Sequence, residues 1–293
     1  MSEILENANH ASASTRARAL AAFAKLDDDA QRTLFAALLK SEFKDVREGV
    51  LDVLSADKIH ADPSWIDAVT ALTDSDPDAE WLLCIGVLAM LARFDQKLPA
   101  NCLVFGENCL KAQNDDLRYQ AACFLEMQED SSEDYVTAIT GLLNSRDEDL
   151  RIVAVQALSR LKPTGCGQKL AEHARHALGL EGFHVLLARL EVGSDDERRQ
   201  LEPELIRQLV DDRFCYPAIV ALKKYGSKLA IEPLLRIASS FLGEPTLRIS
   251  AAEAAAQLGS QEGIVWLNKF AKHSANREYA QLALASIENS ELK

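Results

Sequence analysis

A stretch of small and apolar residues at helical spacing recurs along the chain. Residues 147–161, DEDLRIVAVQALSRL, begin with acidic side chains, carry Arg151 one turn in, and then place Ala154, Ala157 and Leu158 on one side. Residues three and four positions apart share a face of an α-helix, so the stretch predicts an amphipathic helix. Close variants recur about every 33 residues from one end of the sequence to the other. A fixed period of this length indicates a repeat architecture.

Each copy has an anchor residue followed by small or apolar side chains three, six and seven positions later. The recognisable anchors are Arg16, Arg47, Trp81, Arg118, Arg151, Cys215, Arg248 and Arg277. The step from Arg151 to Cys215 is two periods, and the segment 182–193 fills it as a degenerate copy. Gly193, Gly226 and Gly259 are also 33 residues apart. Each follows the last apolar residue of its helix, where a left-handed C-cap requires glycine, so we expect that cap at all three.

A second set of helices, each with its own apolar stripe, is predicted between these copies. Their ranges are 29–40, 63–72, 131–143, 166–178, 195–210, 227–238 and 261–272. Together the two sets predict an all-α protein, an α-solenoid of about nine antiparallel helix pairs without strands. The expected repeats are 1–26, 27–57, 58–95, 96–128, 129–161, 162–193, 194–226, 227–259 and 260–293. No linker or low-complexity tract separates them, so residues 1–293 are predicted to form one elongated domain.

The anchor helices resemble the second helix of HEAT repeats, in their short bacterial version. The resemblance rests on Asp149-Leu150-Arg151 with Ala154, Ala157 and Leu158, on Asp116-Leu117-Arg118 with Ala121 and Leu125, on Val46-Arg47 with Val50 and Leu54, and on Leu247-Arg248 with Ala251 and Ala254. It covers essentially the whole chain and is specific for architecture only. It implies a motif helix on the concave side of each repeat, and an Arg that pairs with an acidic residue of a neighbouring repeat. Trp81, Cys215 and the segment around Gly182 depart from the motif and would lack that pair.

Composition narrows the range of partners. The chain of 293 residues is 48% hydrophobic and only 6% aromatic, as expected for helices packed through small side chains. Its net charge of −13 argues against wrapping nucleic acid or docking on an anionic membrane, and it is compatible with a basic protein partner. The longest apolar run, 81–92, is too short to cross a bilayer. The amino terminus lacks signal-peptide features and the six cysteines form no CxxC pair, so a reducing cytoplasmic location is expected.

Candidate chemistry is sparse. His173, His176 and His184 lie near Glu172, but helix spacing brings at most two of them to one metal and no spacing supplies further ligands, so polar side chains on a helix surface are the simpler explanation. The segment 164–169, TGCGQK, lacks the preceding strand and the Gly-Lys-Ser/Thr of a phosphate loop, so we interpret it as a turn between helices. No nucleophile elbow or zinc-protease motif occurs. We therefore expect no catalytic residue, no cofactor and no metal.

Acidic clusters occur in the turns that lead into helices. The clusters that precede anchor helices contain Asp74, Asp76 and Asp78, then Asp115 and Asp116, then Asp147 and Asp149, and finally Asp211 and Asp212. Carboxylates at these positions cap backbone N–H groups and favour the helix dipole, which is explanation enough. In a stacked array the same turns would also align along one edge and could attract a basic partner.

One further row suggests a contact surface. The residue directly after the anchor is Tyr119, Ile152, Tyr216 or Ile249 in four of the copies. If the motif helices line a concave face, these side chains form a partly apolar ridge suited to a partner helix or peptide. The alternative is that they pack between neighbouring helices.

These patterns favour a non-enzymatic scaffold or adaptor that binds a protein partner on its solenoid surface. The alternative is an enzyme on the same architecture, since HEAT-like folds include DNA alkylpurine glycosylases and bilin-attachment lyases. A glycosylase needs a basic groove with a catalytic Asp, and a lyase needs a pigment and a partner protein. The acidic charge and the lack of a recognisable site argue against both.

Overall fold

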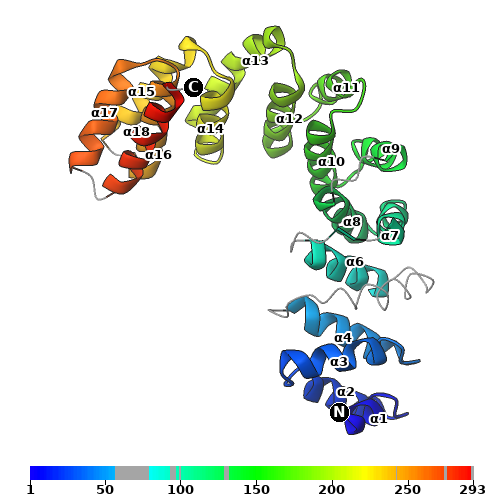
Figure 1. The fold of residues 1–293 in the computed structure, drawn as a ribbon. Coiled ribbons are helices and arrows are strands. Elements are labelled where there is room, and N and C mark those ends of the chain that lie inside the picture. Colours follow the sequence, from blue (N-terminus) through cyan, green and yellow to red (C-terminus); the bar gives the residue numbers. More distant parts are fainter. Residues whose placement is uncertain are drawn as a thin grey trace. The chain divides into compact units, whose positions relative to one another are not determined.

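The computed structural model describes residues 1–56, 79–92, 97–98, 100–128, 132–241, 243–273 and 276–291. Every regular element within these ranges is a helix, which confirms the all-α class (Figure 1). No helix in the described part of the chain is long and apolar enough to span a membrane. The chain divides into two compact units, Met1–Pro163 and Thr164–Lys293. The single elongated domain expected from the sequence stays a prediction.

In unit 1, successive helices belong alternately to two packed layers. In chain order its described helices are α1 (Ser2–Ala8), α2 (Ala13–Phe23), α3 (Asp28–Leu38), α4 (Lys44–Ala56), α6 (Ala79–Ala92), α7 (Ala100–Leu110), α8 (Asp115–Met127), α9 (Glu133–Leu142) and α10 (Glu148–Leu161). The motif helices pack in sequence, α2 on α4, α4 on α6, α6 on α8 and α8 on α10. The intervening helices form the other layer, where α1 contacts α3 and α7 contacts α9.

Unit 2 continues the alternation. Its helices are α11 (Cys166–His173), α12 (Gly179–Val192), α13 (Asp195–Arg207), the 3-10 turn η2 (Gln208–Val210), α14 (Cys215–Tyr225), the 3-10 turn η3 (Lys228–Ala230), α15 (Ile231–Ser239), α16 (Pro245–Gln257), α17 (Gln261–His273) and α18 (Arg277–Glu291). The motif helix α16 contacts α14 on one side and α18 on the other, and it also packs on α15 and α17. Ala251, Ala252, Ala254, Ala255 and Ala256 of α16 are buried, so small side chains permit this close packing on several sides.

Most expected helices are present with shifted ends. The segment 166–178 becomes a helix only to His173, and 195–210 and 227–238 each include a short 3-10 turn. Helix α7 was not predicted, although Cys102, Phe105, Cys109 and Leu110 give it a buried face at helical spacing. The predicted helix 63–72 and the acidic cluster Asp74, Asp76 and Asp78 lie outside the described residues.

The anchor arginines share a contact that the sequence did not reveal. Arg16, Arg47 and Arg151 each donate through Nη1 to the backbone carbonyl six residues earlier, at 2.9, 2.7 and 2.9 Å. These carbonyls belong to the turn that follows the preceding helix, where orphan C=O groups collect and a cation is favourable. Arg16 also pairs with Asp45 of the next motif helix, as expected, whereas Arg118 pairs with Asp115 of its own helix. In these three copies the anchor arginine fastens the motif helix to the turn before it.

The predicted left-handed glycine caps are correct at one position of three. Gly259 has φ +97°, but Gly193 and Gly226 are extended, both with φ −73°. At the latter two the N–H donates to the carbonyl four residues earlier, at 2.8 Å in each case. A Cβ at Gly193 would lie only 2.6 Å from the Arg189 carbonyl oxygen, and one at Gly226 would collide with the Leu222 oxygen. These two glycines are explained by close backbone approach, not by a positive φ.

Candidate partner-binding surface

The four residues of the predicted ridge do not share one environment. Tyr119 and Tyr216 are 37% and 57% exposed, whereas Ile152 and Ile249 are only 7% and 3% exposed. The aliphatic side chains pack between neighbouring helices, whereas both tyrosine side chains are exposed. The expectation of an exposed ridge is therefore wrong for Ile152 and Ile249.

A groove forms around α16 on the face where two of these residues lie. Its walls are α14 and α18, and α16 provides the floor. Two adjoining hollows, of about 530 and 400 Å³, share Tyr216, Ser250 and Glu253. We call this the tyrosine groove, since Tyr216 and Tyr279 lie in the first turns of its two walls.

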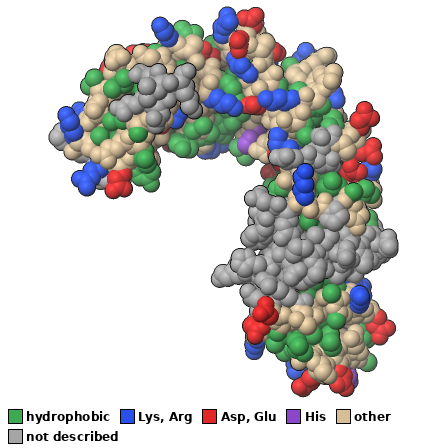
Figure 2. All heavy atoms as spheres, viewed as in Figure 1, with side chains coloured by type: hydrophobic (Ala, Val, Ile, Leu, Met, Phe, Trp, Pro, Cys, Tyr) green, Lys and Arg blue, Asp and Glu red, His purple; other side chains and the backbone are tan. Residues whose placement is uncertain are grey.

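Helical periodicity explains which side chains line the tyrosine groove. Tyr216, Val220 and Lys223 share one face of α14, and Tyr279, Leu282 and Ser286 share one face of α18. On α16 the groove residues are Thr246, Ile249, Ser250, Glu253 and Gln257. Tyr216, Val220, Tyr279 and Leu282 are all exposed, so apolar surface on both walls faces solvent. In Figure 2 hydrophobic side chains gather over the region of α14.

A polar network crosses the groove toward the later turns of the three helices. Lys223 Nζ of α14 lies 2.5 Å from Glu253 Oε1 of α16, and Gln257 Nε2 of α16 donates to Ser286 Oγ of α18 at 3.3 Å. The network joins all three helices. It therefore fixes the spacing of the walls and leaves the tyrosine end as the apolar part of the groove.

The predicted acidic residues lie at the starts of two helices in unit 1. Asp147 caps α10 by accepting from the Leu150 N–H at 3.0 Å. For α8 the cap is Asn114, which accepts from the Leu117 N–H at 3.1 Å, while Asp115 pairs with Arg118. Asp116 and Asp149 are exposed. Both capping and an exposed acidic edge are thus present in the packed pair α8 and α10.

The acidic charge of the chain belongs almost entirely to unit 1. Its 163 residues contain 28 Asp and Glu against 16 Lys and Arg, a net charge of −12, whereas unit 2 contains 17 against 16, a net charge of −1. The net charge therefore disfavours an anionic ligand in unit 1 only.

The candidate metal cluster is not assembled. His173 Nε2 lies 2.7 Å from Glu181 Oε1, and Glu172 accepts from Gln168 at 2.9 Å. Within the described residues no group of three or more His, Cys, Asp or Glu side chains is placed to hold a metal ion. Of the segment 164–169, residues 164–165 form the interpreted turn, with Gly165 at φ +77°, and residues 166–169 are already the first turn of α11.

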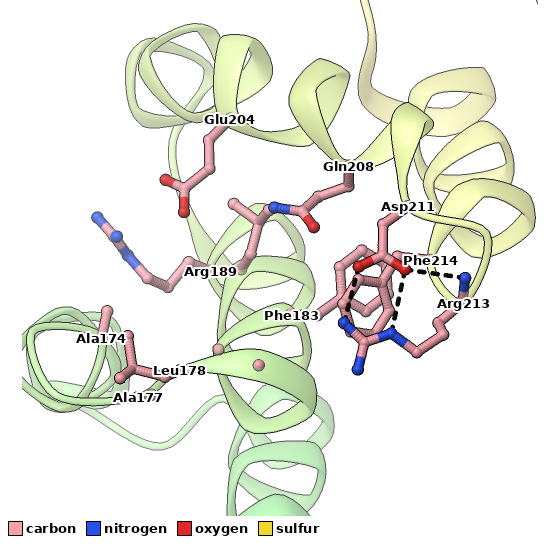
Figure 3. Close-up of a pocket in the computed structure, with 13 residues that line it drawn as sticks. Ala174, Ala177, Leu178, Phe183, Arg189, Glu204, Gln208, Asp211, Arg213 and Phe214 are labelled. Carbon is pink, nitrogen blue, oxygen red and sulfur yellow. Dashed lines mark hydrogen bonds and ion pairs between the residues drawn. The ribbon is translucent and has the colours of Figure 1, made fainter.

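Unit 2 also contains a separate pocket of about 370 Å³, bounded by α11, α12, α13 and the start of α14 (Figure 3). Phe183 and Phe214 stack beneath it, with ring centroids 4.6 Å apart and planes at 14°. Asp211 accepts hydrogen bonds from the Arg213 guanidinium at 3.1 and 2.8 Å, and these bonds lower the pKa of that carboxyl group. The sequence does not predict this pocket, because its residues come from several helices and the connections between them.

Comparison with known proteins adds no family. The sequence matches no protein-family model, and no curated protein matches it significantly.

Proposed function

We propose that the protein is a non-enzymatic scaffold of the HEAT-like α-solenoid type, and that it binds an amphipathic helix of a partner protein in the tyrosine groove. The observation that carries the proposal is the exposure of Tyr216, Val220, Tyr279 and Leu282 on facing walls. Exposed apolar clusters of this kind mark interaction sites, and tyrosine is enriched at the centres of interfaces.

A helix suits the groove better than an extended strand. Tyr216 and Val220 are one turn apart on α14, and Tyr279 and Leu282 are one turn apart on α18. This spacing of about 6 Å matches the anchors that an amphipathic helix presents at positions i, i+3, i+4 and i+7. The α16 floor carries mainly small and polar side chains along its length, so it leaves space between the walls for a third element.

The acidic edge of unit 1 supports a second part of the same proposal. Asp116 and Asp149 are exposed on the first turns of α8 and α10, in a unit with a net charge of −12. Such a field accelerates association with a basic protein and loses its effect as salt screens it. In this proposal the edge steers a basic partner, and the tyrosine groove holds it.

Site-specific photocrosslinking tests the groove. A photoreactive residue replaces Tyr216 or Tyr279 in the full chain expressed in its source cells, and matched probes replace Leu229 and Val265, which are exposed outside the groove. We expect the groove probes to crosslink one protein, at partner residues spaced three or four apart. Equal crosslinking from the control positions, or partner sites without helical spacing, would contradict the proposal.

A further inference from the structure

The pocket of Figure 3 has aromatic and aliphatic side chains at its base and polar side chains around its mouth. Ala177 and Leu178 line it from the connection between α11 and α12, and Phe183 and Leu186 line it from α12. Arg189 of α12, Glu204 of α13 and Gln208 of η2 extend around the opening. At about 370 Å³ the pocket is near the lower end of the range for small-ligand sites, which suits one or two residues of a peptide.

The sides of the pocket are held by contacts that do not involve the side chains at its mouth. His173 and Glu181 bridge the turn between α11 and α12, at 2.7 Å, and Gly179 takes φ +57° within that turn. On the other side, Arg213 is bound to Asp211, and its guanidinium lies 4.9 Å from the centroid of the Phe214 ring. The charges of Asp211 and Arg213 therefore offset each other within this pair.

The three polar side chains at the mouth of the pocket, in contrast, have no such partner among the described residues. Within the described part of the chain, the side chains of Arg189, Glu204 and Gln208 make no hydrogen bond or ion pair with another residue. They offer one cation, one anion and one amide around a base that contains aliphatic and aromatic side chains. A complementary ligand presents a carboxylate for Arg189, an N–H for Glu204 or Gln208, and an apolar group for the interior.

We propose that this pocket binds the carboxyl-terminal residue of a partner protein. The α-carboxylate of that residue pairs with the Arg189 guanidinium, which matches a carboxylate with two parallel hydrogen bonds. Its amide N–H donates to Glu204 or Gln208, and its apolar side chain enters the space above Phe183. Capture of a terminal carboxylate is a recurring mode of peptide recognition.

Exposed apolar side chains near the mouth favour a polypeptide over a small acid. Leu178 lines the pocket and is 81% exposed, and Val210, between the lining residues Gln208 and Asp211, is 89% exposed. Both offer apolar surface beyond the pocket, which the residues before the terminus would cover. The inference rests on the proposed scaffold function but uses a site with no lining residue in common with the tyrosine groove.

Peptides with free and blocked ends test this inference. The probes are fluorescent pentapeptide libraries that end in Leu, Val or Phe, prepared as free acids and as carboxamides, and titrated with the full-length protein. We expect the free acids to bind, and the carboxamides to bind roughly tenfold or more weakly, as for the loss of one charge-assisted contact. Equal binding of both forms, or no binding of either, overturns the inference.

Variants distinguish peptide binding in the pocket from binding in the tyrosine groove and from nonspecific attraction to a positive charge. Arg189→Gln should weaken binding of the free acids as much as amidation does, whereas Arg199→Gln, on the exposed part of α13, should not. Tyr216→Ser should leave peptide binding intact, so failure of the groove and failure of the pocket are distinguishable. N-acetyl-leucine provides the last arm: if it binds as tightly as the pentapeptides, the ligand is a small carboxylic acid and the assignment to a protein terminus is wrong.

Discussion

Arg16 of α2 donates through Nε to both carboxylate oxygens of Asp45 on α4, at 3.0 and 2.9 Å. Its Nη1 donates to the carbonyl oxygens of His10 and Ala11, both at 2.9 Å, and its guanidinium lies 4.2 Å from the ring centroid of Phe43. Arg16 is buried, while the Asp45 side chain is about half exposed. One side chain therefore joins two motif helices and the turn that precedes the first of them.

Replacing this arginine should destabilise unit 1. Because Asp45 is open to solvent, most of the loss in Arg16→Met comes from carbonyls left without a donor, and we expect roughly 2 kcal/mol in the free energy of unfolding. Arg18→Met, on the exposed side of α2, should change it by less than about 0.5 kcal/mol. Urea unfolding followed by circular dichroism measures both variants. An equal effect at the two positions would show that the Arg16 contacts do not matter.

The glycine that ends α14 should not tolerate a side chain. A Cβ at Gly226 collides with the Leu222 carbonyl oxygen, whereas a Cβ at Gly141 in α9 meets no atom within 4 Å. We expect Gly226→Ala to lower the free energy of unfolding by about 1–3 kcal/mol, and Gly141→Ala to raise it by about 0.5–1 kcal/mol. Thermal and urea unfolding of the two variants give opposite shifts if this is right. A stabilised Gly226→Ala would mean that the backbone relaxes freely there.

Two positions of the same repeat register should respond differently to a charge. Ile152→Glu places a carboxylate in a buried site without a partner, so we expect a loss of about 3 kcal/mol or more in stability. Tyr216→Glu changes an exposed wall residue of the tyrosine groove and should leave the fold intact while it abolishes partner crosslinking. Circular dichroism and melting temperature separate the two effects. A folded Ile152→Glu of normal stability would contradict the buried placement of Ile152.

Acidification should weaken unit 2 through His184. Burial lowers the pKa of this imidazole below its usual value near 6.5. The unfolded chain then binds more protons, so stability falls as the pH drops below about 6.5 and levels off below the folded-state pKa. Urea midpoints at pH 7.5 and 5.5 should differ more for the wild type than for His184→Gln. If the urea midpoint shifted equally with pH in the wild type and in His184→Gln, the pH effect would come from other groups.

The cysteines of α7 and α8 should differ in reactivity. Burial, together with the nearby Cys84, raises the pKa of the Cys109 thiol to about 12. The thiolate is the reactive form, so Cys109 should be alkylated only when the structure opens, and the partly buried Cys123 should react first. Timed iodoacetamide labelling with peptide mass spectrometry measures the order. Labelling of Cys109 before Cys123 in the folded protein would contradict the burial.

The helices could be predicted from local periodicity, because a few turns of sequence are enough to show an amphipathic face. Ala251, Ala254 and Ala255 were recognised in this way, and α7 could have been found by its buried Cys102, Phe105 and Cys109. The site was harder to predict, because exposure at the position after the anchor depends on what the neighbouring helices cover. Ile249 and Tyr216 hold the same register but differ in exposure. The pocket beside Arg189 combines four elements whose proximity no local pattern specifies.

The alanine-rich helix α16 has a consequence for how tightly the groove can bind. Its alanines are buried against the neighbouring helices, and the longest floor side chains, Glu253 and Gln257, are already held by Lys223 and Ser286, so the floor loses little side-chain conformational entropy when a ligand is fixed against it. Tyrosine walls add little to that loss, since each ring has only two rotatable angles. A partner held between Tyr216 and Tyr279 would therefore meet a preorganised receptor, and the entropic cost of association would fall mainly on the partner.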